Sequence, residues 1–465
     1  MQYLEPENWT PMSWADRPSK VGYTYPDLTA VARAAADVAS LPPLVTSGEV
    51  ERLKQQIAEA QEGKRFLLQG GDCAETLDEC RPDVITSKLK ILLQMSLVLA
   101  FAGNKPVIRV GRMAGQYAKP RSSPTESRGS GPALPSYFGD LINRAEFTVA
   151  ARTPDPRLMV AGYQHAGLTL NFVRSLIAAG FADMHHPEYW DLGFLKHAGL
   201  TPEVRQAYER LTGQLVRSVR FVEAVGERAF ESIGRVEFFT SHEGLNLHYE
   251  SAQTRRVPRR AGHWNLTTHI PWVGERTRAL DGAHIEYFRG IRNPVGIKVG
   301  PSCSEDELLQ LIDVLNPAEE AGKIVVIARM GAAKVRERLG KLAAAVGRAG
   351  KQVLWVSDPM HGNSTTTRSG VKTRSFDDIL GELNGAWEAL EAAGTRLGGV
   401  HIELTGQDVT ECIGGAAGIG EDDLSRNYVS LCDPRLNYEQ AMELALLLAQ
   451  KMQAPPIARR LQSSG

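Results

Sequence analysis

The feature that most constrains the fold is a series of eight short β-rich segments, each followed by a stretch of helical periodicity. The eight segments are FLLQGGD (66–72), VIRVGRM (107–113), VEFFTSHE (236–243), THIPWVG (268–274), VGIKVG (295–300), KIVVIARMG (323–331), QVLWVSDPM (352–360) and VHIELTG (400–406). Strands that alternate with helices predict a parallel sheet. Because eight such units close into a (β/α)8 TIM barrel, we expect an α/β protein of that class.

Two parts of the chain fall outside a minimal barrel. Residues 1–50, rich in Pro, Trp and small residues, predict an N-terminal arm, and residues 51–465 then form the barrel domain. Residues 140–232 show long helical patterns and no strand pattern, which predicts a helical insertion between the second and third strands. The segment 121–136, rich in Pro, Ser and Gly, is predicted to be a loop.

The charge balance and the apolar stretches exclude several kinds of partner. The formal charge of -1 over 465 residues provides no global field to attract nucleic acid or an anionic membrane. The longest apolar stretches, such as residues 92–103, are shorter than the ~18–20 residues that span a bilayer. Five cysteines without a CxxC pair, and an N-terminus without a secretory pattern, indicate a reducing compartment and a cytoplasmic protein.

Three residues at predicted strand ends and one in a neighbouring loop offer metal ligands: Cys73, His361, Glu403 and, in the loop, Asp433. Barrel enzymes carry their sites at these C-terminal strand ends. One thiolate, one imidazole and two carboxylates suit Mn, Fe, Co or Zn better than Ca or Mg. The structural alternative is a buried apolar Cys, a His in a turn, and acids in ion pairs. Since buried acids that share a cavity repel one another without a cation, the metal site is favoured.

Four cations also stand at predicted strand ends: Arg112, Arg276, Lys298 and Arg329. Because unpaired buried charges are costly, they predict a clamp for a carboxylate or a phosphate, although ion pairs with neighbouring acids explain part of the set. The KPRS segment beyond the second strand suggests a second phosphate site, formed by Lys119, Arg121 and Ser122. A Schiff-base role for Lys298 is a competing hypothesis.

Nine motifs, in chain order, carry a resemblance to a known family. They are QGGDCAE (69–75), GRMAGQYAKPRS (111–122), TSHEGL (240–245), WVGERTRALDGAHIEYF (272–288), NPVGIKVGP (293–301), ARMG (328–331), DPMHGN (358–363), HIELTGQDVTEC (401–412) and CDPRLN (432–437). From about residue 40 onward the chain closely resembles the type II 3-deoxy-D-arabino-heptulosonate 7-phosphate (DAHP) synthases. The resemblance implies a barrel enzyme with a bound metal.

The resemblance implies a reaction and a role for each site residue. Phosphoenolpyruvate condenses with erythrose 4-phosphate and phosphate is released, in the first step of the shikimate pathway toward chorismate and the aromatic amino acids. The implied metal ligands are Cys73, His361, Glu403 and Asp433, with Mn the expected ion and Co, Fe or Zn the alternatives. The implied phosphoenolpyruvate pocket is Arg112, Glu275, Arg276, Lys298 and Arg329, and the implied sugar-phosphate segment is Lys119, Arg121 and Ser122. Lys298 or His361 is expected to move protons.

The resemblance also leaves alternatives open. It implies a homo-oligomer, a dimer or tetramer, with chorismate mutase as a candidate partner. An amino-sugar version of the synthase in an aminoshikimate pathway and an inactive regulatory relative are the competing functions. Loop 134–140 carries Phe138 where many relatives carry Arg, which bears on the aldehyde substrate. Because Cys432 adjoins Asp433, we also expect a Cys73–Cys432 disulfide to form in the metal-free protein under oxidation.

Overall fold

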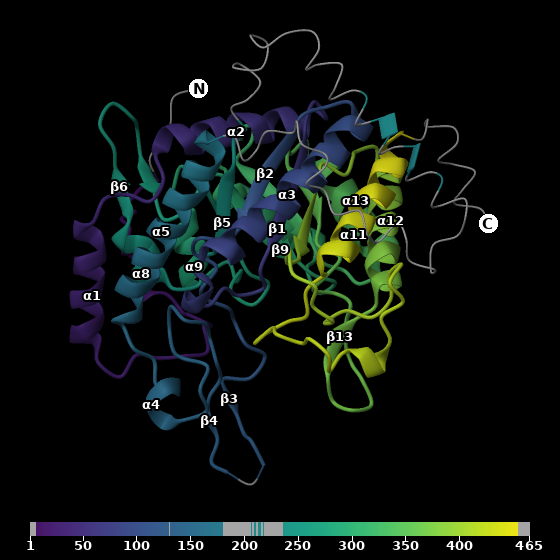
Figure 1. Ribbon diagram of the computed structural model, residues 1–465. Helices are drawn as coiled ribbons and strands as arrows, with labels where there is room; N and C mark the ends of the chain where they lie inside the picture. The colour runs from purple at the N-terminus through teal and green to yellow at the C-terminus, as the bar shows by residue number, and fades with distance from the viewer. Residues whose placement is uncertain are drawn as a thin grey trace.

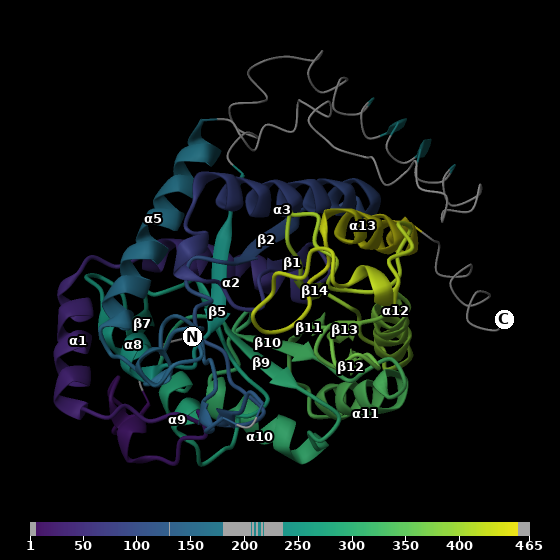
Figure 2. The same ribbon diagram turned by 60° about the horizontal axis from the view of Figure 1, so that its bottom comes forward.

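Eight parallel strands close into a barrel in the computed structural model, which describes residues 6–129, 131–179 and 236–453, together with residues 206, 209–210, 213–214 and 217 (Figures 1 and 2). In order around the barrel they are β1 (Phe66–Gly71), β14 (Gly399–Glu403), β11 (Leu354–Ser357), β10 (Ile324–Ala328), β9 (Val295–Val299), β8 (Ile270–Val273), β5 (Phe239–Glu243) and β2 (Val107–Arg112). Seven of them lie within the predicted segments and β14 begins one residue before its segment, so the predicted barrel is confirmed.

The strand register brings chemically active residues to one level of the barrel. Gly71 pairs with Glu403 on one side and with Arg112 on the other, so β14, β1 and β2 end together. Cys73 follows β1 directly, and therefore enters the same layer as Glu403 and Arg112. This layer is the C-terminal mouth of the barrel, where barrel enzymes hold their sites.

Helices cover the outside of the barrel. They are α3 (Pro82–Gly103), α8 (Leu247–Ala252), α9 (Ala283–Phe288), α10 (Glu305–Leu315), α11 (Val335–Arg348), α12 (Phe376–Ala392) and α13 (Tyr438–Gln453). Among the described residues, α3 alone is long and apolar enough to cross a membrane, but 67% of its most apolar window is buried. It lies beside α13 (Figure 2), so its apolar surface belongs to the core of this fold.

Helix α2 (Ser47–Gln61) closes the N-terminal end of the barrel. Its Leu53, Ile57 and Ala60 are fully buried and form one apolar cluster with the inward side chains of the strands, such as Leu67 and Ile327. The helix begins at a capping box between Thr46 and Glu49, so it runs across the predicted arm boundary at residue 50. With one end closed, ligands reach the barrel interior from the C-terminal mouth.

The N-terminal arm packs on the barrel side. Helix α1 (Leu28–Ser40) contacts α8 and α5 (Leu158–Ala178), and the indole of Trp9 donates a 2.8 Å hydrogen bond to the carbonyl of Glu286 in α9. Helices α4 (Val149–Arg152) and α5 fall in the predicted helical insertion, whose later part, from residue 180, lies almost wholly outside the described residues. Among the described residues there are also three 3-10 turns: Ser13–Asp16, Leu77–Glu79 and Glu421–Asp423.

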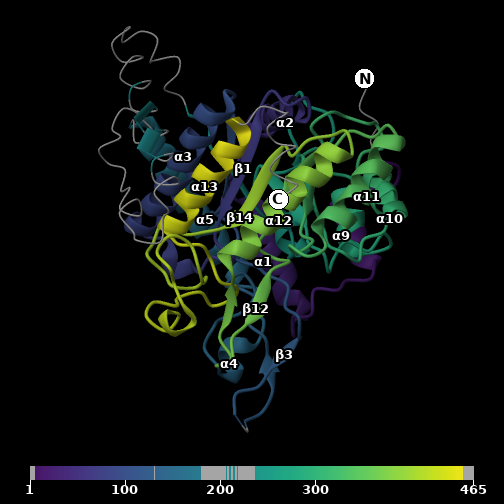
Figure 3. The same cartoon turned by 90° about the vertical axis from the view of Figure 1, so that its right-hand side faces the viewer.

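Two short hairpins project from the barrel end opposite α2 (Figures 1 and 3). One pairs β3 (Thr125–Glu126) with β4 (Leu134–Pro135), inside the segment that was predicted to be a loop. The other pairs β12 (Ser364–Thr366) with β13 (Lys372–Arg374). A third hairpin, on the barrel side, pairs β6 (Thr254–Arg256) with β7 (His263–Asn265). The first two extend the wall of the mouth and contribute residues to it.

Candidate active site

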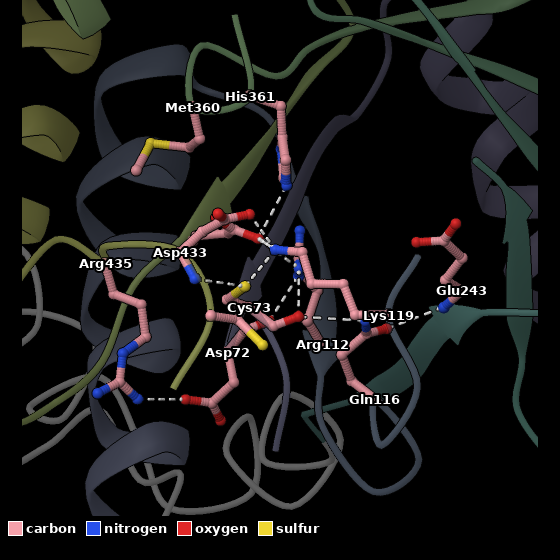
Figure 4. Close-up of polar contacts among 12 residues, drawn as sticks. Asp72, Cys73, Arg112, Gln116, Lys119, Glu243, Met360, His361, Asp433 and Arg435 are labelled. Carbon is pink, nitrogen blue, oxygen red and sulfur yellow. Dashed lines mark hydrogen bonds and ion pairs between the residues drawn. The ribbon is translucent and has the colours of Figure 1, made fainter. Parts of the chain in front are cut away.

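Three of the predicted metal ligands form one buried cluster at the barrel mouth. One ligand atom each from Cys73, Glu403 and Asp433 lies within 4.8 Å of the others, and all three residues are buried. The backbone N–H of Asp433 donates to the Cys73 sulfur at 3.2 Å, which fixes the loop before α13 over the end of β1 (Figure 4). A thiol and two carboxylates so close together are the donor set of a borderline divalent ion.

His361 completes the set from the loop after β11. Its Nε2 lies 2.9 Å from Oε1 of Glu403, and its Nδ1 lies 2.7 Å from Oδ2 of Asp358. A carboxylate behind the ring commonly orients a metal-binding histidine. Burial lowers the pKa of His361, although the two acids oppose the shift. The structure thus brings all four predicted ligands together with the histidine oriented for coordination.

Lys119, which was predicted for the sugar-phosphate segment, lies inside this cluster. Its Nζ contacts the sulfur of Cys73 and Oδ2 of Asp433, and is 3.5 Å from Oε1 of Glu403 (Figure 4). The cluster therefore already accommodates a positive charge, as a metal site must. Burial alone would raise the pKa of Glu403, but His361, Lys119 and the neighbouring arginines hold it well below its usual value.

Arg112 does not reach the cavity wall, although it was predicted for the phosphoenolpyruvate pocket. It is 1% exposed, and its donors are directed to the protein itself. Its Nε donates to the Asp72 carbonyl at 2.9 Å and its Nη2 to Oε1 of Glu403 at 2.9 Å, while the guanidinium lies over the ring of Trp272. In this structure Arg112 holds Glu403 and the end of β1 in place.

A cavity of about 440 Å³ opens above the cluster. Six of its lining residues are cations: Lys119, Arg121, Arg276, Lys298, Arg329 and Lys372. Its lining acids are Glu126, Glu243, Glu275 and Asp433. A cavity with this excess of positive charge suits a ligand with several anionic groups.

Lys298 and Arg329 lie at the inner end of the cavity beside His361. Nζ of Lys298 is 2.9 Å from Oδ2 of Asp358 and 3.3 Å from Nδ1 of His361. Burial lowers the pKa of Lys298, and Asp358 opposes that shift. Nη2 of Arg329 donates to the His361 carbonyl, and its Nε is buried without a hydrogen-bond partner among the described residues. An unsatisfied buried N–H at a cavity wall is available to an anionic ligand.

Arg276 and Ser122 join two loops at the outer end of the cavity. Nη2 of Arg276 donates to the Ser122 hydroxyl at 3.0 Å, and Arg121 lines the same region. Lys372 of β13 adds a cation that the sequence analysis missed, and its Nζ contacts Asp433. The only sequence signal was a basic residue in a polar stretch, because the β12–β13 hairpin was not predicted.

Two glutamates have contrasting roles in the cavity wall. Glu275 accepts hydrogen bonds from the Gly300 amide at 2.7 Å, the Ser302 hydroxyl at 2.9 Å and Nη2 of Arg278 at 3.0 Å, so it fixes neighbouring loops. Glu243 has a buried Oε1 without a partner among the described residues, and burial raises the pKa of its carboxyl group. Sequence analysis did not select Glu243, although its position at a strand end was a usable signal.

Phe138 and Cys432 lie in different surroundings. Phe138 is fully buried and stacks on Tyr23 of the arm, with the ring centroids 5.3 Å apart, so it belongs to the hydrophobic core and not to the cavity wall. The thiols of Cys432 and Cys73 are both free, and a hydrogen bond between them lowers the pKa of Cys432 to about 7. The two sulfur atoms are therefore neighbours.

The comparisons with known proteins agree with this geometry. The sequence matches the class-II DAHP synthetase family over residues 9–449. Three similar proteins are named phospho-2-dehydro-3-deoxyheptonate aldolase. The one from Neurospora crassa is 45% identical over 95% of this chain and 94% of its own length. The one from Streptomyces coelicolor is 47% identical over 94% of this chain and 96% of its own length. The one from Mycolicibacterium smegmatis is 41% identical over 89% of this chain and 88% of its own length.

Among solved structures, the DAHP synthase of Thermotoga maritima aligns with a TM-score of 0.32 and 13% identity, over 84% of this chain and 71% of that one. A likeness so distant carries no argument about this chain. The family match covers nearly the whole sequence, and the three sequence relatives are matched over almost their full length. The chain is therefore an enzyme of the class-II DAHP synthetase family.

Proposed function

We propose that this enzyme condenses phosphoenolpyruvate with erythrose 4-phosphate and water to give 3-deoxy-D-arabino-heptulosonate 7-phosphate and inorganic phosphate, the first step of the shikimate pathway. The observation that carries the proposal is a Cys–His–Glu–Asp cluster at the base of a cavity with six cations. Both substrates are phosphorylated, and phosphoenolpyruvate also has a carboxylate. The excess of positive charge matches that ligand pair.

The cluster fits a divalent ion, for which Mn is proposed and Co, Fe or Zn are alternatives. Cys73, His361, Glu403 and Asp433 would hold it, since their ligand atoms converge and three of the four residues, all but His361, already contact the Lys119 ammonium. When bound, such an ion supplies Lewis acidity toward the aldehyde oxygen. Asp358 keeps Nε2 of His361 directed at the cluster through its contact with Nδ1.

The protein's own cations hold the two substrates. Lys298, Arg276 and Arg329 bind the carboxylate and phosphate of phosphoenolpyruvate at the inner end of the cavity. Arg121, Ser122 and Lys372 bind the sugar phosphate at the outer end, where the two hairpins meet. Because Arg276 also contacts Ser122, it joins the two subsites and sets the distance between the reacting carbons.

The chemistry requires one carbon–carbon bond and one water addition. C3 of phosphoenolpyruvate attacks the aldehyde carbon, and water then adds to C2. The C2–O bond to phosphate breaks, so the phosphate leaves with that oxygen and the product retains a ketone. Glu243, with its unpartnered Oε1 in the cavity wall, is placed to orient the water, while Lys298 stabilises negative charge and exchanges a proton with the substrate.

Several finer points belong to the same proposal. We propose a cytoplasmic homo-oligomer, a dimer or tetramer, with chorismate mutase as a candidate partner. The residues 51–465 are proposed as its catalytic domain and 1–50 as the arm. An active enzyme is favoured over an inactive relative, because every predicted ligand and cavity cation is present in the sequence.

The test compares two aldehydes. Purified enzyme with Mn and phosphoenolpyruvate is given either erythrose 4-phosphate or its imino or amino counterpart, and phosphate release and product mass are measured. The proposal predicts efficient turnover of erythrose 4-phosphate. Preference for the amino sugar would assign the enzyme to an aminoshikimate pathway, and no turnover of either would leave an inactive relative.

A further inference from the structure

Two motif segments contain residues that the proposed function leaves without a role. The segments are ARMG (328–331) and DPMHGN (358–363), which supply Arg329 and His361 to the chemistry. The proposed chemistry does not use Gly331, Gly362 or Asn363. The segments form the loops after β10 and β11, which are neighbouring strands. The unused residues lie where these loops meet.

The two loops pack backbone to backbone. Gly331 has a φ of +82°, a conformation that favours glycine. A Cβ placed on Gly362 would lie 2.3 Å from the Gly331 nitrogen, so only glycine allows this approach. Nη2 of Arg329 also donates to the carbonyl of His361. A displacement of one loop therefore displaces the other, together with its functional side chain.

A buried carboxylate on α12 accepts hydrogen bonds from both loops. Glu382 is fully buried, and its Oε1 accepts from the backbone N–H of Met330 at 2.6 Å, while its Oε2 accepts from Nδ2 of Asn363 at 2.7 Å. Among the described residues no Lys or Arg forms an ion pair with it, and these two hydrogen-bond donors are uncharged N–H groups. A buried carboxyl group is costly unless hydrogen bonds replace its water, and here the loops supply those bonds.

Asn363 extends the connection to both strands' loops. Its Nδ2 also donates to the carbonyl of Pro359 at 2.8 Å, and its Oδ1 accepts from the backbone N–H of Ala332 at 3.0 Å. The side chain thus bonds to its own loop, to the loop after β10 and to Glu382. Neither Glu382 nor Asn363 lines the cavity.

We propose that Glu382 is a positioning residue. Its hydrogen bonds to Asn363 and to the Met330 amide hold the loops after β10 and β11 together and so fix Arg329 against His361. The inference rests on the proposed function, in which Arg329 binds the substrate anion and His361 is a metal ligand. It adds Glu382, a residue outside both loops, on helix α12. The carboxylate of Glu382 determines the relative position of the metal site and the anion site.

The variant that tests it is Glu382→Gln. The side chain keeps its size and one acceptor oxygen, but its amide N–H groups face a hydrogen-bond donor. Glu388→Gln is the matched control, because Glu388 lies on the same helix and pairs with Arg336 at 2.8 Å, away from both loops. The double variant Glu382→Gln/Asn363→Asp exchanges donor and acceptor, which restores the bond between the two side chains.

The readouts are Co²⁺ titration by absorbance without substrates, circular dichroism, and steady-state kinetics. Folded Glu382→Gln is expected to bind Co²⁺ about tenfold more weakly and to raise the KM for phosphoenolpyruvate about tenfold, since indirect partners of metal ligands have effects of this size. The control is expected to change neither by more than about twofold. The double variant restores the bond between the two side chains but loses the bond to the Pro359 carbonyl, so it is expected to recover part of the loss, which a purely structural role would not produce.

Folded Glu382→Gln with unchanged Co²⁺ binding and unchanged KM would overturn the proposal. If Glu382→Gln does not fold, Asn363→Ala decides, because it removes the side-chain hydrogen bonds of Asn363 and leaves the bond between Glu382 and the Met330 amide in place. If neither variant folds while the control does, the proposal would also be overturned, because Glu382 would then be needed for folding and not for positioning the site. Since Co²⁺ titration needs no turnover, a wild-type enzyme that binds Co²⁺ but releases no phosphate would reject the proposed function alone.

Discussion

The ammonium group of Lys119 contacts the sulfur of Cys73, so a cation lies among the atoms that would ligate the metal. A divalent ion must therefore displace this ammonium or bind against its repulsion. In either case we expect Lys119→Met to bind Co²⁺ or Mn²⁺ about tenfold more tightly, by removal of an adjacent charge, while kcat falls. Titration of the chelator-treated protein measures the affinity.

Lys341→Met is the control for that experiment, since Lys341 is exposed on α11 and pairs only with Glu337. It is expected to leave metal affinity unchanged. Weaker metal binding by Lys119→Met would show that Lys119 favours binding of the metal ion. It would contradict the expectation that the ammonium group opposes that binding.

Arg121 tests the assignment of the outer cavity to the sugar phosphate. Arg121→Ala is expected to raise the KM for erythrose 4-phosphate about tenfold, the usual effect of losing one charged hydrogen bond, with little change for phosphoenolpyruvate. Arg128→Ala, an exposed residue of the β3–β4 hairpin that does not line the cavity, is the control. An equal rise in both KM values would place Arg121 at a shared anion site instead.

His284 predicts a loss of stability in acid. It is buried on α9, where its Nε2 donates to the Leu245 carbonyl at 3.0 Å, and burial lowers its pKa from 6.5 to about 4. Between these values the unfolded chain binds a proton that the folded protein does not, so stability present above pH 6.5 is lost as the pH falls toward 4.

The measurement for His284 is urea unfolding of wild type and His284→Gln, which retains a donor for Leu245. The wild type is expected to lose about 2 kcal/mol more than the variant on acidification through this window. Parallel losses in the two proteins would mean that His284 does not titrate in this range.

Cys73 and Cys432 predict a redox response of the metal-free enzyme. Both thiols are free and adjacent. With diamide as the two-electron oxidant, the chelator-treated protein is expected to form a Cys73–Cys432 disulfide, whereas the Mn-loaded protein keeps both thiols because Cys73 is engaged. Non-reducing peptide mapping detects the bond, and only free thiols at both positions after oxidation would reject the pairing.

The barrel could be predicted because each of its strands lies in a short β-rich segment followed by a helix. The grouping of the candidate metal ligands could be predicted because the strand register carries residues such as Glu403 to one level. The direction in which a side chain points could not be predicted. Arg112 ends a strand yet donates to Glu403 and the backbone, and Lys119 reaches the metal cluster from its loop. Such choices depend on partners distant in sequence.

The short hairpins were also missed, for a different reason. Strands of two or three residues, such as β12 and β13, have no periodicity to detect, so Lys372 could not be assigned to the cavity. Glu382 gave no signal either, because an acid within the helical pattern of α12 predicts an exposed position. Only tertiary packing buries it against the two loops.

The most direct test of the account is phosphate release by the chelator-treated enzyme with phosphoenolpyruvate and erythrose 4-phosphate, before and after addition of Mn²⁺. The account predicts no release without metal, restoration of release by Mn²⁺ or Co²⁺, and no restoration in Cys73→Ser at the same metal concentration. Full release by the metal-free enzyme, or none by the Mn-loaded enzyme, would contradict it.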